Sequence, residues 1–193
     1  MPARLHRTLL AASLGALLCG AAAAQSVGYL LAPAHTKVHW EVRHFGTSTQ
    51  RGWFADVQGS VRLDRNSGRG DVSVSIATAS VSSGVAVLDG MLRGNNFLAA
   101  TDHPTAYFVA TGLRFDGERL AEVRGEFTLR GISRPMALRA LNFGCRTDAM
   151  LQREVCGGDF EAELRRSEFG STFGLPFVGD TVRLLIAVEG VRE

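Results

Sequence analysis

The feature of this sequence that most constrains its fold is an alternation of apolar and polar residues that recurs in many short segments. Successive side chains of a β-strand point to opposite faces, so each such segment predicts a strand with one buried face. The alternation is clear at residues 38–44, 72–76, 120–130, 159–166 and 182–188, and weaker at 53–63, 105–111 and 134–143. Only residues 85–93 suggest a helix, and that segment is short.

Eight or more antiparallel strands with one apolar face must close into a barrel or stack as a sandwich, so the chain is predicted to be all-β. An eight-stranded barrel is just wide enough to enclose one small ligand. Small residues on the apolar faces, such as Ala110, Gly125 and Ala162, fit either a cavity or a closely packed core. The sequence pattern leaves both interpretations open.

The first 24 residues have the order of a secretory signal peptide. A basic start is followed by an apolar run at residues 8–18 and by three alanines at 22–24. This order is typical of a cleaved signal, and the run is too short to span a membrane. Cys19 would suggest a lipoprotein, but the residue before it, Leu18, is not small. We therefore expect residues 25–193 to form one domain that is exported to the periplasm and is not an integral membrane protein.

The charge of the exported domain is balanced. The whole chain has 21 basic and 19 acidic residues, and Arg4 and Arg7 lie in the predicted signal, which leaves 19 of each. Nucleic-acid binding relies on a positive field, so we expect no nucleic-acid partner. The sequence has two Trp and two Tyr, which are too few for the aromatic girdles of an outer-membrane barrel. This count argues against that class of barrel.

Cys145 and Cys156 are the two cysteines that remain after removal of the signal peptide. An even pair in an oxidising compartment favours a disulfide over free thiols or a metal site. His35 and His39 have a helical spacing within a predicted strand, which makes a metal site unattractive there. The sequence contains no GxSxG, HExxH or P-loop motif. We therefore predict a binding protein with no metal and no cofactor, rather than an enzyme.

Several motifs, present in one order from Tyr29 to about Glu189, make the chain resemble the YceI-like family of exported proteins. They are residues 34–46 (AHTKVHWEVRHFG), 52–54 (GWF), 92–98 (LRGNNFL), 103–108 (HPTAYF), 125–135 (GEFTLRGISRP), 166–170 (RSEFG) and 178–182 (VGDTV). The resemblance implies a lipocalin-like antiparallel barrel that binds polyisoprenoids or isoprenoid quinones inside it. It implies no agreed catalytic residues.

The candidate ligand-binding residues combine apolar positions with two polar ones. Arg166 and His44 share the apolar phase of their segments, where each would meet a ligand head group, form a structural ion pair or reach water at a strand end. The full set is Trp40, Val42, His44, Val74, Ile76, Phe97, Phe108, Val123, Phe127, Phe160, Leu164, Arg166, Phe169 and Phe173.

The function expected from the residues and the resemblance together is a periplasmic carrier for a polyisoprenoid or isoprenoid quinone, serving transport, storage or sequestration. Two alternatives remain open: a carrier of shorter amphiphiles such as fatty acids or fatty amides, and a stress-linked structural or interaction protein with a packed barrel core. Transient membrane contact and a homodimer are compatible with the sequence.

Overall fold

The computed structural model describes residues 26–64 and 67–193, so the predicted signal peptide lies outside the described residues. Eleven strands and one α-helix, α1 (Ala86–Arg93), make up most of the fold, with three short 3-10 turns, η1 (Pro33–His35), η2 (Thr78–Ser80) and η3 (Arg166–Phe169). The strands are β1 (Val27–Leu31), β2 (Lys37–His44), β3 (Ser48–Phe54), β4 (Val57–Asp64), β5 (Arg69–Ala77), β6 (Val81–Ser82), β7 (Thr105–Asp116), β8 (Arg119–Leu129), β9 (Ile132–Asp148), β10 (Arg153–Arg165) and β11 (Val178–Arg192).

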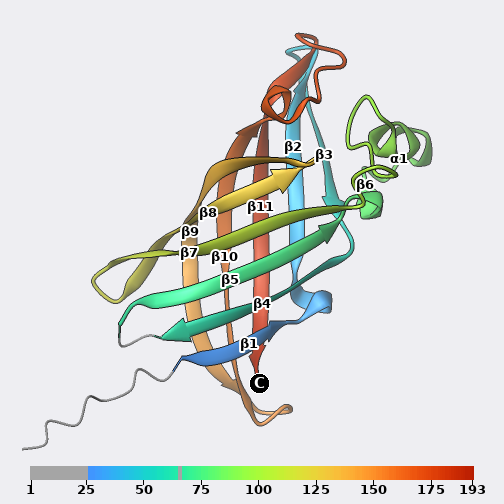
Figure 1. The fold of residues 1–193 in the computed structure, drawn as a ribbon. Coiled ribbons are helices and arrows are strands. Elements are labelled where there is room, and N and C mark those ends of the chain that lie inside the picture. The colour runs from blue at the N-terminus through green and yellow to red at the C-terminus, as the bar shows by residue number, and fades with distance from the viewer. Residues whose placement is uncertain (1–25, 65–66) are drawn as a thin grey trace, which may run out of the picture.

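Eight of these strands close into a ring, in the order β1-β4-β5-β7-β8-β9-β10-β11, and β11 pairs back onto β1. Every pairing is antiparallel, and Tyr29 of β1 sits between Val61 of β4 and Arg192 of β11. The other part of β11 pairs with β2, which carries β3 and β6 beside it (Figure 1). The predicted all-β antiparallel barrel of eight strands with one short helix is confirmed.

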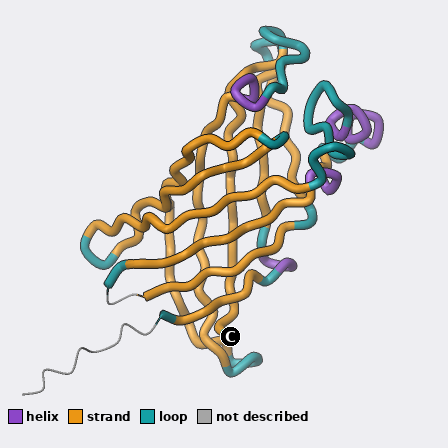
Figure 2. Tube along the Cα trace, viewed as in Figure 1, coloured by secondary structure: helices purple, strands orange, loops and turns teal. Residues whose placement is uncertain are grey.

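The long strands form the barrel wall, and the loops and helices gather toward its ends (Figure 2). At the upper end lie the β2–β3 turn, η3 with the loop that leads to β11, and α1 with the segment that follows it. The β9–β10 turn and the C-terminus lie at the opposite end. None of the described helices is long and apolar enough to cross a membrane.

The alternation correctly identifies which side chains face inward. On β8, Val123, Phe127 and Leu129 are buried, while Arg124 between them is exposed. On β10, Phe160 and Leu164 are buried in the same way. These side chains join one apolar core cluster that runs through the barrel.

The single strand predicted for residues 53–63 is wrong, because two strands, β3 and β4, meet there. Ala55 and Asp56 lie between them, and their backbone groups bond across to Ser80 and Ala77. Those bonds come from a segment distant in sequence, so the local alternation contains no sign of the break. The predicted strands also omit β1 and most of β3.

Cys145 and Cys156 form the predicted disulfide, within the paired strands β9 and β10. They are direct partners in the ladder, and their Cα atoms are 4.0 Å apart. Together with Glu154 they are the one group of potential metal ligands that lies close together in the described part of the chain. Both sulfur atoms are already bonded to each other, which leaves no thiolate for a metal.

Candidate functional site

The interior of the barrel contains two adjoining apolar chambers. The outer chamber, near the upper end, has a volume of about 510 Å³, and the inner chamber has about 130 Å³. Val38, Ile76, Phe127 and Leu184 line both, so these side chains form the wall at which the chambers meet. The outer chamber alone falls in the size range of small-molecule sites.

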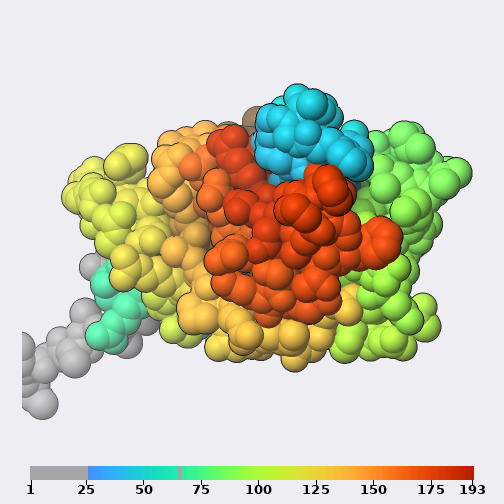
Figure 3. All heavy atoms as spheres, turned by 90° about the horizontal axis from the view of Figure 1, so that it is seen from above, coloured from blue at the N-terminus to red at the C-terminus, as the bar shows by residue number. Residues whose placement is uncertain are grey.

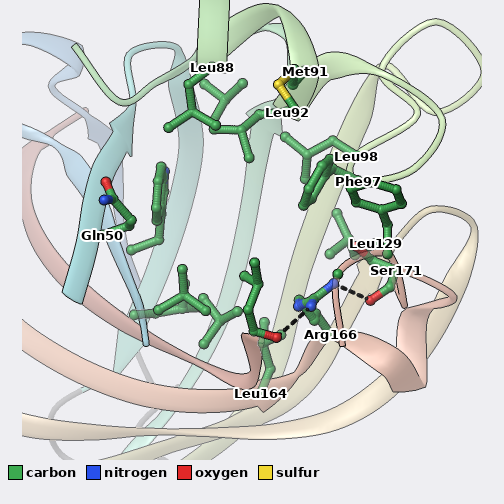
Figure 4. A pocket seen from close by; sticks show the side chains of 18 of the residues that line it. Gln50, Leu88, Met91, Leu92, Phe97, Leu98, Leu129, Leu164, Arg166 and Ser171 are labelled. Atoms are coloured by element: carbon green, nitrogen blue, oxygen red, sulfur yellow. Dashed lines mark hydrogen bonds between the residues drawn. The ribbon is translucent and has the colours of Figure 1, made fainter. Parts of the chain in front are cut away.

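The outer chamber is assembled from elements that are distant in sequence. Leu88, Met91 and Leu92 of α1 project into it from one side, opposite Leu164 at the end of β10 (Figure 4). Gln50 of β3 lies on a further side of the same space. Phe45 and Phe177 line the chamber and are also well exposed, so it opens to solvent at this end of the barrel.

A buried carboxylate on the helix over this opening anchors the helix to the preceding segment by hydrogen bonds. Asp89 of α1 accepts hydrogen bonds from the Ser83 amide at 2.5 Å, the Ser83 hydroxyl at 2.6 Å and the Ser82 hydroxyl at 3.2 Å. The Ser83 bonds, led by the one from its hydroxyl, lower the pKa of Asp89 from its usual 3.8. Arg93 at the end of α1 donates to the backbone carbonyls of Ala79 and Val81, and these contacts hold the helix to η2 and β6.

The inner chamber is enclosed almost entirely by aliphatic and aromatic side chains. Its walls come from the inward faces of the ring strands, for example Val74 of β5, Phe108 of β7 and Phe160 of β10. Tyr29 and Thr36 bring hydroxyl groups to this lining: the Tyr29 hydroxyl donates to Glu154, and the buried Thr36 hydroxyl has no hydrogen-bond partner in the described structure. This chamber therefore offers an apolar group an almost entirely apolar environment.

Arg166 is the one charged side chain in the lining of either chamber, among the described residues. It is buried, and its guanidinium donates to the backbone carbonyls of Gly179 (Nε, 2.8 Å), Ser171 (Nη1, 2.8 Å) and Val178 (Nη2, 2.9 Å). Burial lowers the pKa of Arg166 from its usual 12.5, and the nearby Asp180 carboxylate opposes that shift. The three neutral carbonyls each accept one hydrogen bond from the guanidinium and do not neutralise its charge.

Asp180 does not form an ion pair with Arg166. Its carboxylate accepts bonds from the Ser167 amide and hydroxyl at 2.9 and 2.8 Å and from Arg165 at 3.1 Å. The structural ion pair considered for Arg166 is therefore absent from the described residues, and Arg166 instead bonds to the loop before β11 at Ser171 and to the first two residues of β11, Val178 and Gly179.

Trp40 contributes its indole ring to the outer lining, which also contains the polar residues His44, Gln50 and Ser171. Its indole Nε1 is buried and has no hydrogen-bond partner among the described residues. The indole packs against Gly52 of the neighbouring β3, where a Cβ would collide with the Trp40 ring and with the carbonyl oxygen of Ser82. The GWF motif thus supplies the glycine that allows this close approach.

All but one of the predicted ligand-binding residues line the chambers. The outer chamber contains Trp40, Val42, His44, Ile76, Phe97, Phe127, Leu164, Arg166 and Phe173. The inner chamber contains Val74, Ile76, Phe108, Val123, Phe127 and Phe160. The exception is Phe169, which is absent from both linings because its ring is buried behind Phe127 in an edge-to-face contact.

Several lining residues were not predicted from the sequence. The α1 residues Leu88, Met91 and Leu92 are spaced as one face of a helix, and this spacing was a usable signal. Gln50, within β3, and Ser171, in the loop before β11, have no such signal, because these two segments acquire a common environment only in the folded barrel.

Fold and site together define a closed antiparallel barrel that encloses an apolar cavity with one charged group near its open end. The profile of the YceI-like domain matches residues 29–190, and this chain belongs to that family. A UPF0312 protein of Azotobacter vinelandii is 32% identical over 192 residues, which cover 98% of this chain and 100% of the relative.

Solved structures share the same fold. The YceI protein of Campylobacter jejuni superimposes with a TM-score of 0.66 at 25% identity, over 78% of this chain and 90% of that one. A polyisoprenoid-binding domain from Saccharophagus degradans superimposes with a TM-score of 0.63 at 12% identity, over 88% of this chain and all of that one. At 12% identity the second likeness concerns the fold alone.

Proposed function

We propose that this protein is a periplasmic carrier that holds a polyisoprenoid or an isoprenoid quinone inside its barrel, for transport, storage or sequestration. The observation that carries the proposal is the pair of adjoining apolar chambers, open at one end and with one buried guanidinium in the outer lining. The name of the Saccharophagus degradans domain, which has the same fold, gives the ligand class.

The chambers suit a long, flexible apolar chain. They lie in series, and the wall that they share at Val38, Ile76, Phe127 and Leu184 is wholly apolar. A chain that extends past this wall transfers apolar surface from water into both chambers, at roughly 25 cal/mol for each Å² buried. A shorter amphiphile fills the outer chamber alone. A ligand that also occupies the inner chamber therefore belongs to the long-chain class, and one that does not occupy it belongs to the shorter amphiphiles.

The polar groups of the outer chamber suit a ligand head group. Arg166 carries a positive charge that no described carboxylate pairs with, and His44 and Gln50 line the same chamber. Charge-assisted hydrogen bonds from a guanidinium to a phosphate or a polarised carbonyl are stronger than neutral ones. A phosphate at the outer chamber would neutralise the charge that the described residues leave unpaired, and a quinone carbonyl would accept a hydrogen bond there.

The lining supports binding rather than catalysis. The described residues that line the chambers include no carboxylate, and the one cysteine, Cys156, is held in the disulfide. Export to the periplasm is part of the same proposal, supported by the signal pattern of the sequence and by the disulfide.

Titration with fluorescent polyprenyl analogues of two chain lengths tests the carrier function. Phe160→Trp fills part of the inner chamber and costs about 1–3 kcal/mol of overpacking. The long analogue should bind about tenfold or more weakly to this variant, and the short one should bind as it does to the wild type. Near-UV circular dichroism verifies that the variant is folded.

Glu163→Gln is the matched control, because Glu163 lies on the same strand but is exposed on the outer face. It should bind both analogues normally. Equal binding of the long analogue by Phe160→Trp and the wild type would place the chain outside the inner chamber and favour the carrier of shorter amphiphiles.

A further inference from the structure

The open end of the outer chamber is surrounded by apolar side chains that point into solvent. We call Phe45, Val87, Met91, Phe173 and Phe177 the mouth rim. Val87 is 77% exposed, Phe45 and Phe177 are each 60% exposed, and Met91 and Phe173 are half exposed. Seen from above, the β2–β3 turn lies beside the loop before β11, with the segment around α1 at one side (Figure 3).

Phe45 occupies a backbone position that an aromatic residue rarely adopts. Its φ is +50°, in the left-handed region that favours glycine and asparagine, and it lies at the tip of the β2–β3 turn. Its ring stacks on Phe177 with centroids 5.6 Å apart, which joins the two loops. A large apolar residue that is both strained and exposed points to a role in recognition rather than in stability.

The rim is accompanied by positive charge. Arg43, Arg93 and Arg130 bond to backbone carbonyls in the turns around the mouth, and none has a carboxylate within 4.0 Å in the described part of the chain. The carboxylates of Asp89 and Asp180 at this end are held by serine and arginine donors. The exposed carboxylates of Glu168 and Asp102 neutralise only part of the positive charge of these arginines.

We propose that the mouth rim docks on the surface of a lipid bilayer that contains anionic lipids, with the opening of the outer chamber against the membrane. Aromatic and aliphatic side chains enter the boundary between head groups and acyl chains, and nearby arginines attract anionic head groups. The rim residues Phe45, Met91, Phe173 and Phe177 also line the outer chamber. A lipid therefore passes between bilayer and chamber along a continuous apolar surface; this passage, though not the docking, rests on the proposed carrier function.

Flotation with phosphatidylglycerol-containing vesicles tests the docking. The purified exported protein should float with them, less so with pure phosphatidylcholine vesicles, and less as salt screens the arginines. Val87→Asp is the main variant, because Val87 lies outside the chamber linings and an acidic residue in the first turn of α1 favours the helix. It should reduce vesicle binding about fivefold or more.

Two further variants sharpen the result. Phe45→Asn removes a rim side chain and places a residue suited to the left-handed region at the turn, so it should weaken docking without unfolding the protein. Met150→Asp is the matched control: Met150 is 93% exposed, but it lies in the β9–β10 turn at the opposite end of the barrel. This control should float as the wild type does.

The outcomes separate docking from lipid carriage when uptake of a polyprenyl analogue dispersed without vesicles is measured in parallel. A wild type that takes up the analogue but does not float overturns the docking and leaves the carrier function intact. Flotation without uptake supports the docking and contradicts the carrier function. Equal loss in Met150→Asp and Val87→Asp overturns the proposed orientation, and self-association abolished by Val87→Asp assigns the rim to a second copy instead.

Discussion

Phe169 packs edge-to-face against Phe127, with ring centroids 5.8 Å apart and ring planes at 72°. Phe127 lines both chambers, whereas Phe169 is 1% exposed and lines neither. Phe169 therefore stabilises the wall that the two chambers share, and it acts on a bound ligand only through Phe127. The RSEFG motif thus places a polar lining residue and a core residue within one short 3-10 turn.

Truncation of Phe169 should destabilise the whole barrel. Phe169→Ala removes a fully buried ring, for which a loss of about 3–5 kcal/mol in the free energy of unfolding is usual. Urea denaturation followed by circular dichroism measures this loss. Phe173→Ala, in the same loop but half exposed, should change the midpoint little, and an unchanged midpoint for Phe169→Ala would show that the ring is not a core element.

Replacement of Arg166 should affect both stability and binding. Arg166→Met leaves three carbonyls in or near the outer chamber without their donors, which should cost about 2–4 kcal/mol of stability. Arg166→Lys keeps the charge but not the planar arrangement of donors. If the charge meets a phosphate head group, the Lys variant should retain measurably more affinity than the Met variant in titrations with a polyprenyl phosphate. Equal affinity of the two folded variants would restrict Arg166 to a structural role.

The disulfide should be intact in the exported protein and should stabilise it. Closure of a loop between residues separated by eleven positions is worth about 3 kcal/mol in the chain-entropy model. The double variant Cys145→Ser/Cys156→Ser should therefore lose about this much of its free energy of unfolding, which appears as a lower urea midpoint. Intact-mass analysis after alkylation, with and without reductant, verifies the bond; labelling of two thiols without reductant would contradict it.

Several carboxylates make the fold sensitive to acid. The Arg146 side chain, followed by the backbone amides of Leu151 and Met150, lowers the pKa of Asp148 from its usual 3.8 to about 2. Hydrogen bonds from Arg183 and Arg139 lower the pKa of Glu161 likewise. Since each group binds its proton less readily in the folded state, its contribution is complete above its ordinary pKa and disappears as pH falls through the folded pKa.

Urea midpoints should therefore be steady above about pH 5 as far as these groups are concerned, and should fall between about pH 4 and pH 2. Asp148→Asn, which removes the most strongly shifted carboxyl, should make this fall shallower. A fall of the same steepness in Asp148→Asn would show that the β9–β10 turn does not contribute to the acid response.

The sequence pattern predicted the parts of the fold that depend on local alternation. On β8 and β10 the inward residues, including Phe127 and Phe160, were identified because a period of two fixes the face once the strand is known. The disulfide was predicted because two cysteines follow the predicted signal peptide and the predicted compartment is oxidising. The inward phase of Arg166 was identified by the same reasoning.

The parts that were missed depend on contacts between distant segments. The partners of Arg166 are backbone carbonyls of Ser171, in the loop before β11, and of Val178 and Gly179 at the start of β11, and backbone groups have no side-chain signature in the sequence. The break at Ala55 and Asp56 depends on bonds to Ser80 and Ala77. Phe169 was assigned to the lining because a buried aromatic residue near a loop has the same sequence appearance whether it faces the cavity or lies behind its wall.

Native mass spectrometry of the protein purified from its native cells is the decisive test of the proposed lipid carriage. The purified protein should be heavier than the mature chain by one polyisoprenoid or isoprenoid quinone, and denaturation should release that ligand. Lipid extraction and fragmentation would then identify it. A protein that is isolated with the mass of the chain alone, and that takes up no polyprenyl ligand afterwards, would contradict the account and favour a barrel that is packed shut.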